Sequence, residues 1–303
     1  MTRTKATEGQ YRRKGDTLWN RYVRETGQND PIRFCEWIAD QKPSIRKTTW
    51  RLYKQSAVLI LRDRGYDDPA NKLAQIGSDG CRAGHETLRR GVSDRDVDRL
   101  WNASRGSPAR IKTWLWVVAG RATGLRPSEW EHARLENGPG GPVLIVRNAK
   151  HTNGRGHGET RRINLSDLVH LATYTDSPNA NEAWNAIEAH LFNVVQEKAK
   201  PDGFRRYTCT CRKTLYRLSK ESGVKGISLY TSRHQFVADA KRAGRSKMEV
   251  ASLMGHSSDE TATIHYGRRI QGRGESVPLP DPEEVARVRD SVRKSIPAPS
   301  LND

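Results

Sequence analysis

Five side chains have the types that phosphodiester chemistry needs, and they occur in the order Arg126, Lys150, Arg233, His256 and Tyr266. Cleavage builds negative charge on the non-bridging oxygens of phosphorus, so fixed cations aimed at these oxygens lower the barrier. A phenol oxygen can act as the nucleophile, and a lysine or histidine can move protons. Together the five residues supply what breaking a DNA phosphodiester requires without a metal ion.

Two arginines suit the phosphate better than lysines would. A guanidinium stays protonated, and its planar fork can bond two phosphate oxygens at once. Arg126 follows ATGL at 122–125, and Arg233 lies in SRHQF at 232–236, at the predicted start of a helix. For a lone arginine, a structural ion pair is the ordinary alternative, for example Arg126 with Glu129.

The segments around these residues resemble the tyrosine recombinase, or phage integrase, family in order, spacing and local sequence. The resemblance covers roughly residues 93–270 and is carried by ATGLRPSE at 122–129, SRHQF at 232–236 and LMGHSS at 253–258, with Tyr266 ten residues after His256. It implies a mainly α-helical protein with a small antiparallel β-sheet in its C-terminal domain. Its two domains would form a C-shaped clamp around DNA.

The resemblance also implies a role for each residue. Arg126 and Arg233 would clamp the scissile phosphate, and Tyr266 would attack it, leaving a 3′-phosphotyrosine and a free 5′-hydroxyl. Lys150 would protonate the leaving oxygen, and His256 would donate a hydrogen bond to a non-bridging oxygen. The structural alternatives are an ion pair, a turn lysine, a helix-capping histidine and an ordinary packed tyrosine.

One position departs from the family's pattern. Three residues before Arg233 the family usually has His or Lys, and this chain has Tyr230. A neutral phenol donates hydrogen bonds but accepts a proton poorly, so we expect Tyr230 at the catalytic site without a general-base role. His234 resembles the family's histidine that orients the clamp from behind, and we expect Glu129 to support Arg126 similarly.

Composition favours a nucleic-acid partner. The 303 residues carry 53 Lys and Arg against 35 Asp and Glu, which gives a formal net charge of +18. Such a charge promotes salt-dependent binding to anionic polymers. The sequence has no apolar run of membrane-spanning length and no signal peptide. We therefore expect double-stranded DNA as the partner, no membrane association, and a cytoplasmic, nucleoid-associated protein.

The cysteines and histidines form no metal-binding pattern. Cys209 and Cys211 are too closely spaced for a usual structural zinc site, and no HExxH motif occurs. We expect reduced thiols, no metal and no cofactor.

Composition shifts along the chain predict five segments. They are an N-terminal extension at 1–13, a helical DNA-clamping domain at 14–78, a linker at 79–92, the catalytic domain at 93–270 and a tail helix at 271–303. In the clamping domain, helices are predicted at 17–26, after an Asp30 cap, and from Ser44. Beside the third helix lie four basic residues that we expect on the DNA backbone, although a solvated polar face is the alternative: Arg46, Lys47, Arg51 and Lys54.

The catalytic domain is predicted to be mostly helical with a small sheet. Ser93 and Asp96 are spaced as a capping box, which predicts a helix start there. Strands are predicted at 143–146 and 162–165. Further helices are predicted at 181–198, 211–222, 232–243 and 246–254.

The tail carries an apolar stripe at helical spacing, formed by Val285, Val288, Val292 and Ile296. Such a helix could pack on its own domain. In the resembling family it often docks on a neighbouring protomer, so exchange within a homo-tetramer is the other expectation.

The family implies four protomers that join two duplexes through a Holliday junction. Two other functions remain open. One is a type IB topoisomerase, which relaxes supercoils with a similar residue set. The other is a catalytically silent, sequence-specific DNA-binding protein, which Tyr230 favours. Covalent trapping on nicked DNA separates the silent protein from both enzymes, and junction formation separates the recombinase from the topoisomerase.

Overall fold

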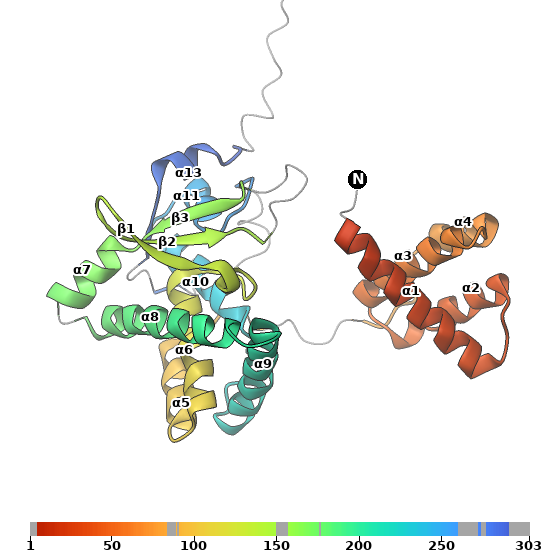
Figure 1. Ribbon diagram of the computed structural model, residues 1–303, viewed down its shortest axis with the longest axis horizontal. Helices are drawn as coiled ribbons and strands as arrows, with labels where there is room; N and C mark the ends of the chain where they lie inside the picture. The colour runs from red at the N-terminus through yellow and green to blue at the C-terminus, as the bar shows by residue number, and fades with distance from the viewer. Residues whose placement is uncertain are drawn as a thin grey trace, which may run out of the picture. The chain divides into compact units, whose positions relative to one another are not determined.

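The computed structural model describes residues 5–83, 89, 91–149, 157–175, 177–259, 272–273 and 277–290 (Figure 1). The chain divides into two compact units, Met1–Thr87 and Leu88–Asp303. Helices predominate, and one small antiparallel sheet lies in the second unit, so the predicted fold class is confirmed.

The first unit is helical throughout its described elements. These are α1 (Lys5–Thr26), α2 (Pro31–Asp40), the 3-10 turn η1 (Lys42–Ser44), α3 (Lys47–Asp63) and α4 (Asp67–Gln75). Helix α1 begins well before the predicted start at residue 17. Its first turns are polar and charged, with an Arg12–Glu8 ion pair of 3.6 Å, so apolar periodicity does not reveal them.

The starts of α2 and α3 follow the local signals more closely, whereas α4 was not predicted. Asp30 caps α2 by accepting a hydrogen bond from the Arg33 N–H at 2.8 Å, as predicted. The third helix starts at Lys47 rather than Ser44, because η1 occupies the preceding residues. Aromatic side chains from α1, α2 and α3 fill the core, among them Tyr22, Phe34 and Trp50.

The second unit surrounds helix α6. Its helices are α5 (Asp94–Ser104), α6 (Pro108–Thr123), η2 (Glu129–His132), α7 (Ser166–Tyr174), α8 (Pro178–Lys198), α9 (Gly203–Glu221), α10 (Thr231–Arg242), α11 (Lys247–Leu253) and α13 (Pro282–Ala286). Ser93 and Asp96 form the predicted capping box at the start of α5. Helix α9 begins eight residues before its predicted start at 211, because Phe204 and Tyr207 extend the buried stripe that Cys211 and Leu215 continue.

Four antiparallel strands form the sheet in the order β1-β2-β3-β4. They are β1 (Arg134–Gly138), β2 (Gly141–Arg147), β3 (Thr160–Asn164) and β4 (Leu279–Pro280). The inner strand β2 contains the predicted strand 143–146, and β3 overlaps the predicted strand 162–165 but ends at Asn164; Leu144 pairs with Ile163. The outer strands were not predicted, since β1 lacks apolar alternation and β4 is a two-residue edge strand that includes a proline.

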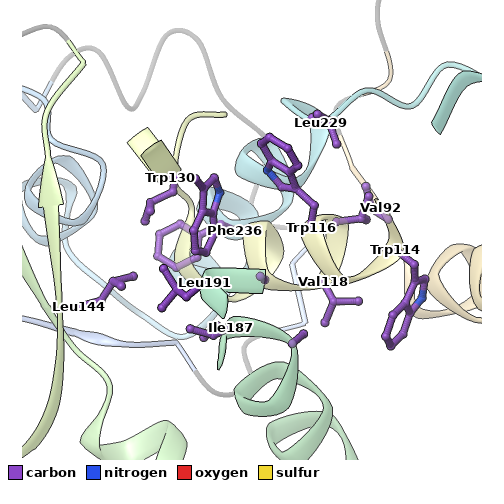
Figure 2. Close-up of a cluster of buried hydrophobic side chains, with 14 of the residues drawn as sticks. Val92, Trp114, Trp116, Val118, Trp130, Leu144, Ile187, Leu191, Leu229 and Phe236 are labelled. Carbon is purple, nitrogen blue, oxygen red and sulfur yellow. The ribbon is translucent and has the colours of Figure 1, made fainter. Parts of the chain in front are cut away.

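Helix α6 contacts α5, α8, α9 and α10, and most of its residues are buried. Figure 2 shows part of this core, where Trp116, Trp130 and Phe236 gather with Ile187 and Leu191. The end of α6 is therefore fixed by packing on several sides. The residues that follow it, beginning with Gly124, enter the candidate site.

The described tail packs on its own unit and is not one long helix. Strand β4 pairs with β3, α13 ends at Ala286, and Arg289 then forms a parallel bridge with Ser258. Val288 is buried there. The prediction of one continuous tail helix from 271 is wrong, because only Pro282–Ala286 is helical within residues 277–290, and strand pairing and a bridge replace helical hydrogen bonds on either side. Val292 and Ile296 lie outside the described residues.

Candidate active site

A buried carboxylate lies at the centre of the candidate site. Glu129 Oε1 accepts a hydrogen bond from Arg126 Nη1 at 2.5 Å, and Glu129 Oε2 accepts one from the Arg126 N–H at 2.8 Å. Arg161 Nη2 donates to Oε2 at 2.8 Å, and Arg233 Nη1 lies 3.6 Å from the same oxygen. One carboxylate thus holds three guanidiniums that come from the loop after α6, from β3 and from α10.

Arg233 is fully buried and is fixed by backbone carbonyls as well. Its Nη1 donates to Gly124 O at 2.6 Å, and its Nη2 donates to Met254 O at 2.6 Å. Its Nη2 also lies 3.3 Å from His256 Nε2. Because an arginine can only donate, Nε2 must accept here, and the His256 ring proton is then on Nδ1.

Arg161 is a member of this cluster that we did not predict as a site residue. Its Nε donates to Leu253 O at 3.0 Å, and its Nη1 bonds Asn148 Oδ1. In β3, Arg161 and Ile163 alternate as the buried positions. An arginine in phase with a buried isoleucine was the sequence signal that could have indicated this position.

The cluster shifts the protonation of its acid and of its histidine. Burial alone would raise the pKa of Glu129, but Arg161, Arg233 and Arg126 outweigh it and hold that pKa well below its usual value. Burial, together with the charges of the same arginines, lowers the pKa of His256 to about 2. Near neutral pH the site therefore contains three cations, one carboxylate and a neutral imidazole.

Two left-handed glycines allow the chain to pass close to these side chains. Gly124 has φ +68° and ends α6, and a Cβ there would lie 2.8 Å from Phe236 Cγ. Gly255 has φ +61°, and a Cβ there would lie 2.8 Å from Arg161 Nη1. Gly124 itself supplies one of the carbonyls that bind Arg233, and Gly255 directly follows Met254, which supplies the other. A side chain at either glycine would clash with its neighbours.

Tyr230 and His234 lie beside the cluster at the start of α10. Their rings meet edge to face, with centroids 5.3 Å apart. A cavity of about 380 Å³ is lined by Tyr230 and Arg126 together with Arg212 and Tyr216 of α9. Tyr230 is exposed over 37% of its surface and lines this cavity together with Arg126.

Helix α9 presents a basic surface next to this cavity. Its exposed positions include six basic side chains: Arg205, Arg206, Arg212, Lys213, Arg217 and Lys220. The acidic residues at its two ends are paired, Asp202 with Arg205 at 2.9 Å and Glu221 with Arg110 at 2.6 Å. The cavity therefore lies between Arg126 and the exposed cationic face of α9.

Lys150 and Tyr266, the predicted general acid and nucleophile, lie outside the described residues. The chain just before Lys150 is anchored in the cluster, because the Ala149 N–H donates to Glu129 Oε1 at 3.3 Å. Seven residues after Tyr266, Arg273 Nη1 lies 2.6 Å from Asp94 Oδ1.

The predicted DNA-contacting residues of the first unit differ in their surroundings. Arg46, Lys47 and Arg51 are exposed. Lys54 donates to the carbonyls of Ala74 and Ile76 at 3.0 and 2.8 Å, so its ammonium caps the C-terminal end of α4. The exposed basic surface of this unit that could contact DNA therefore consists of Arg46, Lys47 and Arg51.

Two features are absent from the described part of the chain. No helix there is long and apolar enough to cross a membrane. No group of three or more His, Cys, Asp or Glu side chains is placed there to hold a metal ion.

Comparison with curated proteins finds a match to tyrosine recombinase XerC of Roseiflexus castenholzii, with 28% identity over 211 residues. The match covers 67% of this chain and 63% of that protein, which is less than two thirds of the relative's own length. The predicted similarity to tyrosine recombinases is confirmed by this match. No model of a known protein family matches the chain.

Solved structures whose backbone follows a similar path include two complexes with DNA. The Tn1549 transposon integrase in complex with a circular intermediate DNA has a TM-score of 0.48 and 15% identity, covering 84% of this chain and 95% of that chain. A lambda integrase dimer bound to a COC′ core site has a TM-score of 0.40 and 13% identity, covering 88% of this chain and 82% of that chain.

Proposed function

We propose that this chain is a tyrosine recombinase, a site-specific enzyme that cleaves and rejoins DNA through a 3′-phosphotyrosine intermediate. The observation that carries the proposal is the convergence of Arg126, Arg161 and Arg233 on Glu129, with neutral His256 beside them. A cluster with this excess of positive charge fits a phosphate that gains negative charge during reaction. The match to XerC supports the same conclusion.

The described residues suit stabilisation of a phosphorane-like transition state. Buried guanidiniums held by Glu129 and by backbone carbonyls need little reorganisation when the charge develops. His256 would use its Nδ1–H as a donor, since a pKa of about 2 excludes imidazolium near neutral pH. Tyr230 would contribute a phenolic hydrogen bond from the cavity side.

Bond breaking and bond making balance within the proposed residues. The Tyr266 oxygen forms the new bond to phosphorus, and the phenolic proton passes to solvent water as the oxygen attacks. The bond to the 5′-oxygen breaks, and the Lys150 ammonium supplies the proton to that oxygen. The reverse attack by a 5′-hydroxyl reseals the strand, so neither a metal nor ATP is required.

DNA binding would use basic surfaces of both units. In the second unit the exposed face of α9 adjoins the cavity at Arg126. In the first unit Arg46, Lys47 and Arg51 are available. We propose that the two units close on duplex DNA as a C-shaped clamp, and that four protomers exchange strands through a Holliday junction. Tail exchange between protomers would have to involve residues beyond the cis-packed 277–290.

Covalent trapping tests the proposal. A pool of nicked duplexes with randomised sequence should yield a protein–DNA adduct, because the short strand released by cleavage diffuses away and prevents resealing. Tyr266→Phe removes only the attacking hydroxyl and should abolish the adduct. Tyr174→Phe, at an exposed tyrosine, should retain it. Adducts that persist in Tyr266→Phe would contradict the assignment.

The absence of any adduct with the wild-type chain would favour the alternative of a catalytically silent DNA-binding protein. Tyr230 is the observation that supports this alternative, because a neutral phenol replaces a usual proton acceptor. If adducts form, two labelled duplexes decide between the enzymes. A recombinase joins them in a junction, whereas a type IB topoisomerase only relaxes supercoils.

A further inference from the structure

A second cavity lies in the second unit, at the first turns of α6 and α9. Its volume is about 320 Å³, and Pro108, Ala109 and Gly203 line it at these two helix starts. None of its lining residues belongs to the arginine cluster or to the cavity at Tyr230. Sites for small molecules begin at about 300 Å³, so this cavity has room for a small ligand.

The charged side chains of this cavity are mostly basic. Lys112, Lys200 and Arg206 line it together with one carboxylate, that of Glu197. Glu197 Oε1 accepts a hydrogen bond from Lys112 Nζ at 3.0 Å, and its Oε2 accepts one from Lys200 Nζ at 2.9 Å. These hydrogen bonds lower the pKa of Glu197, so the group is ionised near neutral pH. The lining therefore has two net positive charges.

The buried part of the lining is neutral. Tyr207 and Cys211 line the cavity with 5% and 2% of their surface exposed. Burial raises the pKa of the Cys211 thiol to about 11 and also raises the pKa of the Tyr207 phenol. Both groups are protonated near neutral pH, so they present no negative charge to a ligand.

The two helix starts add favourable backbone dipoles. A helix N-terminus has N–H groups without intrahelical partners and a partial positive charge. Neither N-cap residue, Ser107 of α6 or Asp202 of α9, accepts a side-chain hydrogen bond from its own first turn. Asp202 instead pairs with Arg205 at 2.9 Å. Oxyanions bind at such helix starts, and here the dipoles supplement the three cationic side chains of the cavity.

We propose that this cavity binds a small phosphate monoester, such as a sugar phosphate. A monoester carries about −1.5 to −2 charge at pH 7, which matches the two net positive charges of the lining. A phosphate of the DNA backbone carries one negative charge and has a sugar on either side, so it matches neither the charge nor the concave shape. Because the ligand would contact both α6 and α9, its binding would stabilise the second unit.

This inference goes beyond the proposed function and does not rest on it. Isothermal titration calorimetry of the whole chain at constant ionic strength tests it. Ribose 5-phosphate should bind in a saturable way. Dimethyl phosphate, a diester with a single charge, should bind more weakly on the order of ten-fold.

Two variants change the charge and the shape of the cavity separately. Lys112→Ala removes one cation and should weaken ribose 5-phosphate binding on the order of ten-fold. Ala109→Leu keeps every charge but fills part of the cavity, and it should weaken binding as well. Arg206→Ala, which breaks no ion pair among the described residues, is the charge test if Lys112→Ala does not fold.

Lys225→Ala is the matched control, because it removes the same charge from an exposed position outside the cavity. It should bind ribose 5-phosphate as wild type does. Phosphate bound at the arginine cluster would survive Lys112→Ala and Ala109→Leu, so the binding lost in these two variants belongs to the cavity.

Equal affinity for ribose 5-phosphate in Lys112→Ala, Ala109→Leu and Lys225→Ala would overturn the inference, as would a wild-type chain without saturable binding. In fluorescence anisotropy, Lys112→Ala should bind duplex DNA as wild type does, both with random sequence and with the cleavage sequence recovered by trapping. Weaker DNA binding with a shallower salt dependence would assign the cavity to a DNA phosphate and also overturn the inference. Covalent trapping tests the proposed function separately.

Discussion

Glu129 is the residue whose replacement should affect the candidate site most. Glu129→Gln removes the negative charge that compensates Arg126, Arg161 and Arg233 and leaves buried guanidiniums without a counterion. Removing one partner of a buried ion pair costs about 3 to 5 kcal/mol. We expect a loss of that order in the free energy of unfolding, measured by denaturant titration of the whole chain.

Glu131→Gln provides the control, since that carboxylate lies in the same short 3-10 helix but has only a distant, exposed contact with His132 at 3.9 Å. It should change stability by less than about 0.5 kcal/mol. Equal stability of the two variants would show that the arginines do not depend on Glu129.

At the scale of single residues, local sequence located Arg126, Arg233 and His256, and the structure brings them together. Each lies within a short motif whose neighbours are visible in the sequence. Arg161 could not be located from its neighbours in sequence, because its burial follows from the packing of β3 against the end of α11, where its Nε donates to Leu253 O. Lys54 shows the opposite case, in which a basic side chain on a polar face is used inside its own unit.

The turn after α11 should tolerate no side chain at Gly255. Gly255→Ala would place a Cβ in a left-handed backbone conformation and against both Asn148 and Arg161. We expect a destabilisation of about 1 to 3 kcal/mol and loss of adduct formation, because the turn carries Met254 O and His256. Thermal unfolding and covalent trapping measure the two effects.

Gly244→Ala is the matched control, since that glycine also has positive φ, +83°, but meets open space. It should lose some stability from backbone strain and keep adduct formation. If Gly255→Ala trapped DNA as well as Gly244→Ala, close packing at this turn would not matter for the site.

Two buried histidines should make the second unit sensitive to acid. Burial lowers the pKa of His190 to about 3, and burial with the nearby arginines lowers that of His256 to about 2. The unfolded chain therefore binds more protons below pH 6.5, the ordinary histidine value. Stability should be full above that pH and fall below it by about 1.4 kcal/mol per pH unit for each histidine.

Denaturant unfolding between pH 5.5 and 7 tests this slope where carboxylates contribute little. His190→Gln should remove about half of the slope, whereas His132→Gln, at an exposed histidine, should leave it unchanged. A slope that survives in His190→Gln without reduction would assign the acid sensitivity to other groups.

Among the elements, helix starts that are marked by a capping residue were predicted correctly, whereas elements without such a local signal were not. The capping box at Ser93 and the Asp30 cap fix helix starts through contacts three residues apart. Strand β4 depends on pairing with β3, more than a hundred residues earlier in the chain, and the short helix α13 that follows it packs on α11. An apolar stripe at helical spacing could not reveal that competition.

The whole molecule should bind DNA with a strong dependence on salt, in line with its net charge of +18. If Arg212 contacts a phosphate, Arg212→Ala should weaken binding to all duplexes and reduce the slope of log affinity against log salt by about 1. Fluorescence anisotropy with short duplexes over a range of NaCl concentrations measures the slope.

Arg134→Ala should leave the slope unchanged, because Arg134 lies on β1 and pairs with Glu136 at 2.7 Å. Should Arg212→Ala weaken binding to the recovered cleavage sequence only, Arg212 would instead read a base.

Composition indicated the anionic partner, and the linker signals lie near the observed boundary between the two units. The proposed assembly would depend on surfaces that come together on DNA, and no local pattern in one chain determines it.

The way Glu129 is shared among three guanidiniums has a further consequence. One negative charge cannot neutralise three positive ones, so the cluster carries an excess of positive charge that a bound oxyanion would offset. If the chain acts on DNA as proposed, part of the free energy of binding would be held in the fold beforehand, as mutual repulsion among side chains that packing keeps from separating. Binding of the phosphodiester would then also stabilise the second unit.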